Sequence, residues 1–98
     1  MEYMELEVYS QSTNRAVVKM PSRHFPGLVI QGDSLSNLLD LAESICKKSE
    51  KTSDIDLIKE SRELRNNLQQ LLFHYEATLS KHNIPLPYSK SQFPPHQS

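Results

Sequence analysis

The side chains best suited to metal or nucleophilic chemistry are four histidines and one cysteine. Two metal ligands on one helix face need a spacing of three or four residues, whereas His74 and His82 are eight apart, about 12 Å along a helix axis. His24 and His96 lie in distant segments, and Cys46 has no partner at C-x-x-C spacing. We therefore expect no metal or cofactor site, and histidines that face solvent or are hydrogen-bonded.

Ser34, Asp33 and His24 supply the residue types of a nucleophile, an orienting acid and a base. Nearness in sequence does not establish the required geometry, and the chain lacks a G-x-S-x-G elbow. Asp33 and Ser34 also suit a helix N-cap, because apolar helical periodicity begins directly after them. The sequence thus favours a protein without catalytic residues, with a small hydrolase using His24 as the weaker alternative.

The segment 23–33 is the least ordinary part of the chain. Two prolines in and before it fix the backbone, which is typical of a shaped connection rather than a strand. We expect Arg23, His24 and Gln31, with Asp33 beside them, to present a polar surface at a sheet edge. The plainer interpretation is architectural, namely a rigid turn, a strand and a capped helix.

Alternating apolar and polar residues predict strands at 4–9 and 15–20. The polar segment 10–14 predicts a turn between them, so the two strands should pair as an antiparallel hairpin. A short β-branched run at 28–31, ended by Gly32, predicts a third strand.

A first helix is expected to follow at once. Its apolar residues recur every three or four positions, and basic residues near its end suit the negative end of the helix dipole. The cysteine on this stripe is expected to be a buried structural thiol, because an apolar setting disfavours the thiolate. The stripe comprises Leu35, Leu38, Leu39, Ala42, Ile45 and Cys46.

A second helix is expected to start near Ser53, which with Asp56 resembles a capping pair. If unbroken from Asp54 to His82, it has 29 residues and a length of about 43 Å. Its apolar residues repeat at close to 3.5 positions, interrupted by Ser61. This length exceeds the needs of a small domain, so either the helix breaks or part of it projects and contacts another chain. The interface candidates are Leu64, Leu68, Leu71 and Tyr75.

The order β-β-β-α-α predicts an α+β fold with a small three-stranded antiparallel sheet packed on two C-terminal helices. A chain of 98 residues, 37% of them hydrophobic, can build one modest core. We expect a single domain at 1–88 and a flexible, proline-containing tail at 89–98.

The composition narrows the partners. Eleven basic against twelve acidic residues give a net charge of −1, which argues against non-specific nucleic-acid binding. The acidic amino terminus lacks the pattern of a signal peptide, and no apolar run is long enough for a membrane span. A single cysteine gives no sign of an oxidising compartment. These features predict a soluble cytoplasmic protein with a protein partner.

Two resemblances rest on particular residues. The segment 25–35, FPGLVIQGDSL, resembles the proline-glycine, strand, glycine-aspartate and helix passage of HicB-type antitoxins, within a match over roughly 17–45. In that family this passage leads from a hairpin into a helix, on a small α+β fold that binds a toxin.

Residues 6–88 are also similar to a family of small bacterial proteins of unknown function. This second resemblance implies a bacterial origin and a single domain. The shared pattern is NRAVVKM at 14–20, Arg23, FPG at 25–27, QGDSL at 31–35, His74-Tyr75 and LPY at 86–88.

The leading hypothesis is a non-enzymatic bacterial interaction protein, namely an immunity protein or antitoxin that neutralises a toxin by steric occlusion. The sheet edge or the segment 23–33 would contact the partner by strand addition or side-chain pairing. The alternative hypothesis is a homo-oligomeric structural or regulatory module, such as a homodimer, assembled through the long second helix and without catalytic activity.

Overall fold

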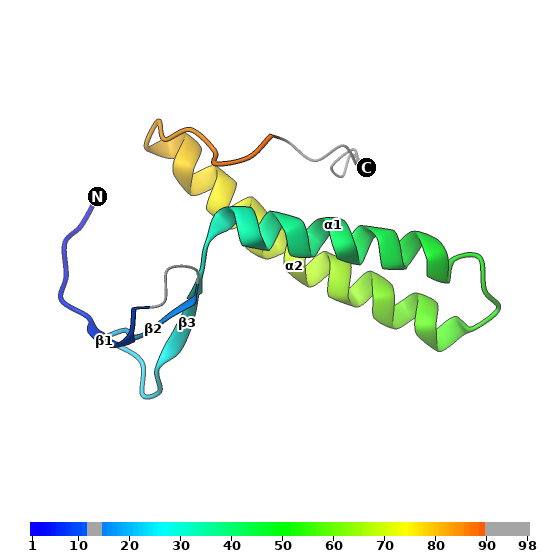
Figure 1. The fold of residues 1–98 in the computed structure, drawn as a ribbon, viewed down its shortest axis with the longest axis horizontal. Coiled ribbons are helices and arrows are strands. Elements are labelled where there is room, and N and C mark those ends of the chain that lie inside the picture. The colour runs from blue at the N-terminus through cyan, green and yellow to red at the C-terminus, as the bar shows by residue number, and fades with distance from the viewer. Residues whose placement is uncertain (12–14, 90–98) are drawn as a thin grey trace. The chain divides into compact units, whose positions relative to one another are not determined.

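A computed structural model of the chain describes residues 1–11 and 15–89. The chain divides into two compact units, which we call the strand unit (1–31) and the helical unit (32–98). Three strands in the first unit precede two helices in the second, which confirms the α+β class and the predicted element order (Figure 1). The packing of the sheet on the helices and the single-domain span 1–88 stay predictions, and the expected tail beyond residue 89 lies outside the described residues.

The strand unit is an antiparallel sheet of β1 (Glu7–Ser10), β2 (Arg15–Lys19) and β3 (Gly27–Ile30), in that spatial order. The predicted hairpin of the first two strands is confirmed, and its 10–14 turn falls largely outside the described residues. The first strand begins three residues later than predicted, at Glu7, which pairs with Lys19. The pairing stops there because Pro21, just beyond Lys19, cannot donate a ladder hydrogen bond.

The connection between β2 and β3 opens with a tight turn, in which the backbone N–H of Arg23 donates to the Met20 carbonyl at 3.0 Å. Pro21 occupies the position in this turn that a fixed φ suits best. The third strand pairs with the second through Val17–Leu28 and Ala16–Val29. It ends at Ile30, one residue earlier than predicted.

The helical unit is a hairpin of α1 (Gly32–Ser49) and α2 (Ile55–Lys81), which lie side by side (Figure 1). The first helix begins at Gly32, so Asp33 and Ser34 lie in its first turn rather than at its cap. There the Asp33 carboxylate accepts the backbone N–H of Ser34 at 2.8 Å. Neither helix is long and apolar enough to cross a membrane.

The second helix is continuous over 27 residues, two fewer than predicted, because the two ends of the predicted span serve as its caps. Asp54, not Ser53, is the N-cap, and its side chain accepts the backbone N–H of Leu57 at 3.0 Å. After the C-cap His82, Asn83 adopts a φ of 58°. The N–H of Ile84 then donates to the Leu79 carbonyl, the bond of a Schellman motif.

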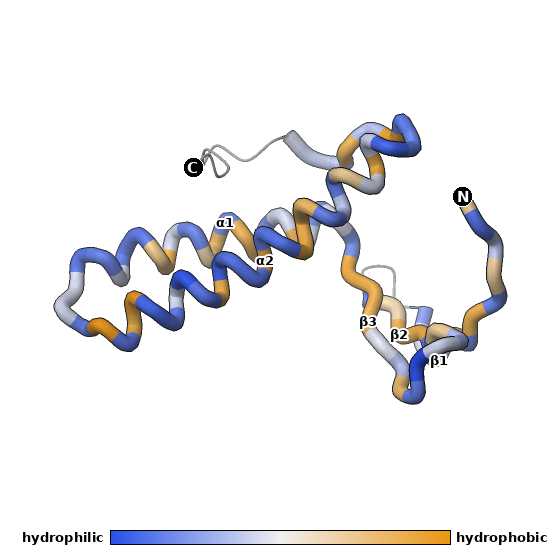
Figure 2. The backbone as a smooth tube through the Cα atoms, turned by 180° about the vertical axis from the view of Figure 1, so that it is seen from behind, coloured by the Kyte–Doolittle hydropathy of each residue, from blue (hydrophilic) through white to orange (hydrophobic). Residues whose placement is uncertain are grey.

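The two helices pack along a seam that repeats every three and four residues. Orange segments recur along both helices in Figure 2, as this spacing requires. Cys46 is 2% exposed, which confirms the predicted buried thiol. The buried α1 positions of the seam are Gly32, Leu35, Leu39, Ala42, Cys46 and Ser49. The buried or partly buried α2 positions are Ile58, Ser61, Arg65, Leu68, Leu72, Tyr75 and Leu79.

The interpretation of Ser61 as a break in the apolar stripe was wrong. This side chain is buried in the seam, and its hydroxyl donates to the Leu57 carbonyl at 2.7 Å. Because the seam passes through Ser61, Leu57 and Leu64 fall beside it and remain exposed. A small residue at this point therefore fixes which face of α2 meets α1.

Candidate protein-binding surface

The predicted surface residues occupy three places in the fold. Arg23 and His24 lie in the β2–β3 connection, Gln31 follows β3 directly, and Asp33 lies in the first turn of α1. All four are exposed. The first three belong to the strand unit and Asp33 to the helical unit, so a joint surface of all four stays a prediction.

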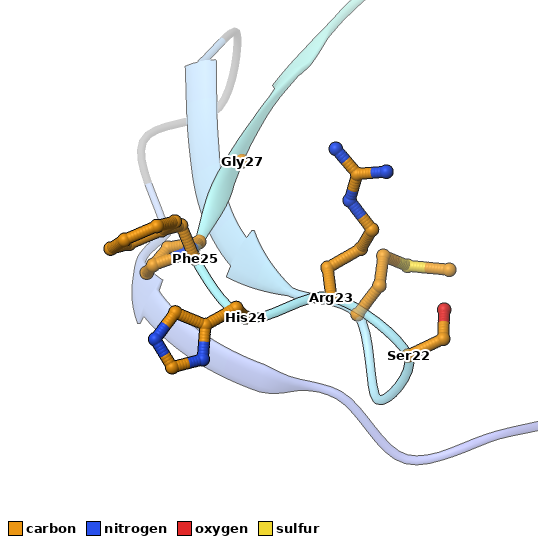
Figure 3. Close-up of a pocket in the computed structure, with 7 residues that line it drawn as sticks. Ser22, Arg23, His24, Phe25 and Gly27 are labelled. Atoms are coloured by element: carbon orange, nitrogen blue, oxygen red, sulfur yellow. The ribbon is translucent and has the colours of Figure 1, made fainter.

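The β2–β3 connection forms an open concavity of about 470 Å³, lined by Met20 and residues 22–27. The rings of His24 and Phe25 extend to one side of the connection, while Arg23 and Ser22 extend to another (Figure 3). Arg23 and His24 thus extend in different directions (Figure 3), and their predicted place in one polar surface stays a prediction.

The aromatic side of the connection is built by two neighbouring rings. The centroids of His24 and Phe25 lie 4.7 Å apart with an interplanar angle of 81°, an edge-to-face arrangement that aromatic pairs prefer. Phe25 is nevertheless 75% exposed. Aromatic side chains are enriched in protein interfaces, so an exposed one of this size can serve as an anchor that a partner covers.

The other side of the connection carries a cation. Within residues 1–11 and 15–89, no hydrogen-bond acceptor or carboxylate engages the Arg23 guanidinium. A guanidinium can donate two parallel hydrogen bonds to a carboxylate, so this side suits an acidic side chain or a chain end. The connection as a whole thus offers an apolar anchor and a carboxylate-binding group a few residues apart.

The third strand continues this surface. It hydrogen-bonds to β2 on one edge, and its other edge has no strand partner among the described residues. Its apolar side chains Leu28, Val29 and Ile30 are all exposed. An uncovered edge strand can accept an additional strand through its backbone N–H and C=O groups. We call Arg23, His24, Phe25 and β3 the turn–strand surface.

The four helix-interface candidates divide into two pairs. Leu68 and Tyr75 pack against the buried cluster of Leu35, Leu39 and Leu72 within the hairpin, and their part in an intermolecular surface stays a prediction. Leu64 and Leu71 are 49% and 57% exposed and lie beside this seam. Two further exposed apolar residues of α1, Leu38 and Ile45, were assigned to its buried stripe by the sequence pattern. Leu38 and Ile45 are seven residues apart, as are Leu64 and Leu71. This shared spacing was the sequence signal for a second apolar face beside the seam.

The residues considered for metal or hydrolytic chemistry lie apart in the fold. His24 belongs to the strand unit, whereas Ser34 and Asp33 belong to the helical unit. His74 lies within α2 and His82 caps it. In the part of the chain that the structure describes, no three histidine, cysteine, aspartate or glutamate side chains gather as a metal site would need.

The chain belongs to a family of unknown function, DUF6959, whose model matches residues 1–88. This confirms the expected similarity to a family of unknown function over nearly the same span. The particular sequence pattern and the resemblance to HicB-type antitoxins stay predictions. No curated protein and no solved structure matches the chain.

Proposed function

We propose that this member of the DUF6959 family is a non-catalytic protein-binding module that engages its partner through the turn–strand surface. The observation that carries the proposal is Phe25, a large aromatic side chain that is 75% exposed beside an uncovered edge strand. Aromatic and arginine side chains are enriched among the residues that dominate protein interfaces. Phe25 and Arg23 supply both types within one short connection.

Binding would combine three contributions. The partner's apolar surface covers Phe25 and Leu28, a partner carboxylate receives the Arg23 guanidinium, and a partner strand hydrogen-bonds to the free edge of β3. The balanced charge of the chain favours a protein over a nucleic acid as this partner. The resemblance to HicB-type antitoxins makes a toxin the first partner class to test, with steric occlusion of its active site as the mechanism.

Site-specific photo-cross-linking tests this proposal. Benzoylphenylalanine is placed at Leu28 in one variant and at Phe25 in another, in the cells that naturally produce the protein. Gln70, an exposed position of α2, receives the same group as the control. We expect adducts with one other protein from both turn–strand positions and none with that protein from Gln70.

The next test asks whether the Leu28 adduct depends on the positive charge of Arg23. Arg23→Glu should abolish the Leu28 adduct, whereas Lys59→Glu, the same charge reversal on an exposed α2 residue, should leave it. If the captured partner arrests growth when expressed alone, co-expression of the wild-type chain should restore growth and the Arg23→Glu variant should not. Equal adducts from Leu28 and Gln70, or none from either, would contradict the proposal.

A further inference from the structure

The helical hairpin has two edges of opposite character. In heptad notation the seam occupies positions a and d, so positions e and g flank it on each helix. Glu43 and Gln69 are both e positions, and they hydrogen-bond across the hairpin at 3.0 Å. Glu50 and Arg62 are likewise e positions, and they form an ion pair at 3.5 Å. The two helices are therefore antiparallel, and the e positions of both helices share one edge.

The polar edge continues to the open end of the hairpin. There Glu76, also an e position, accepts the phenol of Tyr88 at 2.8 Å. Tyr88 itself packs against the buried leucine cluster. Side chains of this chain thus close the e edge at three successive levels.

The g positions lie on the opposite edge by the same geometry, and all of them except Thr78 are apolar. Their hydrophobic side chains are between 39% and 57% exposed. No g position in α1 or α2 carries a charge, since the remaining one is Thr78. The g-position residues that form this open face are Leu38 and Ile45 of α1 and Leu57, Leu64 and Leu71 of α2.

We infer that the open face is a homodimer interface, on which a second copy of the hairpin completes a four-helix bundle. Helices with apolar a, d and g positions are typical of bundles, in which the third position meets a second layer. A two-helix hairpin uses a and d internally and leaves g without a layer to cover it. Two copies supply the four helices that such a pattern needs.

The charges around the open face fit a second copy. A two-fold dimer places the same surface on both sides, so any charge at the centre would meet its own kind. The centre of the open face has no charge, and its bordering positions carry both signs, with Lys48 and Lys81 against Glu60. Leu41, also on this border, is exposed and extends the apolar area.

The size of the open face also fits. Two helices about 9 Å apart make a surface about 20 Å wide, and the 18 residues of α1 give it a length of about 27 Å. The flat footprint is therefore roughly 500 Å², and the accessible area is larger because side chains make the surface ridged. This area approaches the accessible area of about 800 Å² that each partner contributes to a standard interface. We therefore expect a reversible dimer rather than an obligate one.

Sedimentation equilibrium of the full chain from 1 to about 200 µM tests the inference, a range that brackets the micromolar affinity expected of a modest interface. We expect a mass that rises from 11.3 kDa toward twice that value. Leu71→Lys should raise the dissociation constant at least about 30-fold, since it puts a charge at the centre of the interface. Gln70→Lys adds the same charge on the adjacent residue, outside the open face, and should leave the constant unchanged.

Far-UV circular dichroism of both variants separates dimer loss from unfolding, and we expect full helicity because neither residue belongs to the seam. Isotope-filtered NOEs in a mixture of labelled and unlabelled chains should link the methyl groups of Leu38, Leu64 and Leu71 between copies. A monomer throughout the concentration range would overturn the inference and assign the open face to another occupant. Intermolecular NOEs confined to the strand unit would overturn it as well. Neither outcome depends on the turn–strand surface, whose partner is tested separately.

Discussion

The helical unit and the strand unit contain similar residues in different surroundings. In the helical unit two helices lie against each other, so Leu35, Leu39 and Leu72 share a buried cluster. The strand unit is a single layer of three strands, and none of its described residues is buried. Leucine, glycine and a hydrogen-bonded tyrosine–glutamate pair occur in both units. The contribution of a residue to stability therefore depends on whether its own unit supplies a second layer of secondary structure to cover it.

Leucine should show the largest contrast between the units. Leu72 is 5% exposed and Leu28 is 56% exposed. Leu72→Ala leaves a cavity in the seam and should lower the free energy of unfolding by about 3 kcal/mol, whereas Leu28→Ala should change it by less than about 0.5 kcal/mol. Urea unfolding monitored by circular dichroism measures the effect of Leu72→Ala. Amide hydrogen exchange in β2 and β3 measures the effect of Leu28→Ala. Equal losses in both variants would show that Leu28 is as well packed as the seam.

Glycine should show the next largest contrast. A Cβ atom built on Gly32 would overlap the ring of Tyr75, whereas one on Gly27 would meet no atom within 4 Å. Neither glycine has a positive φ, so backbone freedom does not distinguish them. Gly32→Ala should cost about 2 kcal/mol through overpacking, although alanine is ordinarily the better helix residue. Gly27→Ala is the control and should be close to neutral in the same urea experiment. A stabilising Gly32→Ala would show that the helices can separate without cost.

The tyrosine–glutamate pairs should show the smallest contrast. Tyr9 donates to Glu7 and Tyr88 donates to Glu76, both at 2.8 Å. The pKa of the Tyr88 phenol is raised mainly by partial burial and secondly by the hydrogen bond to Glu76. The pKa of Tyr9 is raised mainly by the hydrogen bond to Glu7. Tyr88→Phe should cost about 1 kcal/mol at pH 7, because only this pair lies against a packed cluster. Tyr9→Phe serves as the exposed control and should have no measurable effect.

The raised pKa of Tyr88 also sets the direction of a pH dependence. The folded state holds this phenol neutral, so the stabilisation is fully present below the ordinary tyrosine pKa of 10.0 and is lost as the pH rises above it. Urea midpoints between pH 8 and about 11 should therefore fall more for the wild type than for Tyr88→Phe. Parallel pH profiles would contradict a raised pKa of Tyr88 in the folded state.

The kinds of element and their order follow from the residue pattern alone. Alternation of period two predicts the paired strands, and Pro21 explains why the ladder ends at Lys19. Helical periodicity predicts both helices, although α1 begins at Gly32, before its predicted cap at Asp33 or Ser34, and α2 is capped by Asp54 rather than Ser53. The sequence places Phe25 only within a connection, because no sequence pattern indicates that an aromatic side chain is exposed.

Which apolar residues are buried depends on how the two helices pack. The leucines at 57, 64, 68, 71 and 72 lie on more than one adjacent stripe of α2, and the predicted stripe includes all of them. Packing against α1 keeps Leu68, Leu72 and Tyr75 of the predicted stripe but runs through Ser61 rather than through Leu57 and Leu64. Gly32 lies against the ring of Tyr75 at one end of this seam. The physical reason is that periodicity defines the faces of one helix, whereas the choice among faces depends on the shape of the helix that meets it. That choice also leaves Leu64 and Leu71 on the open face.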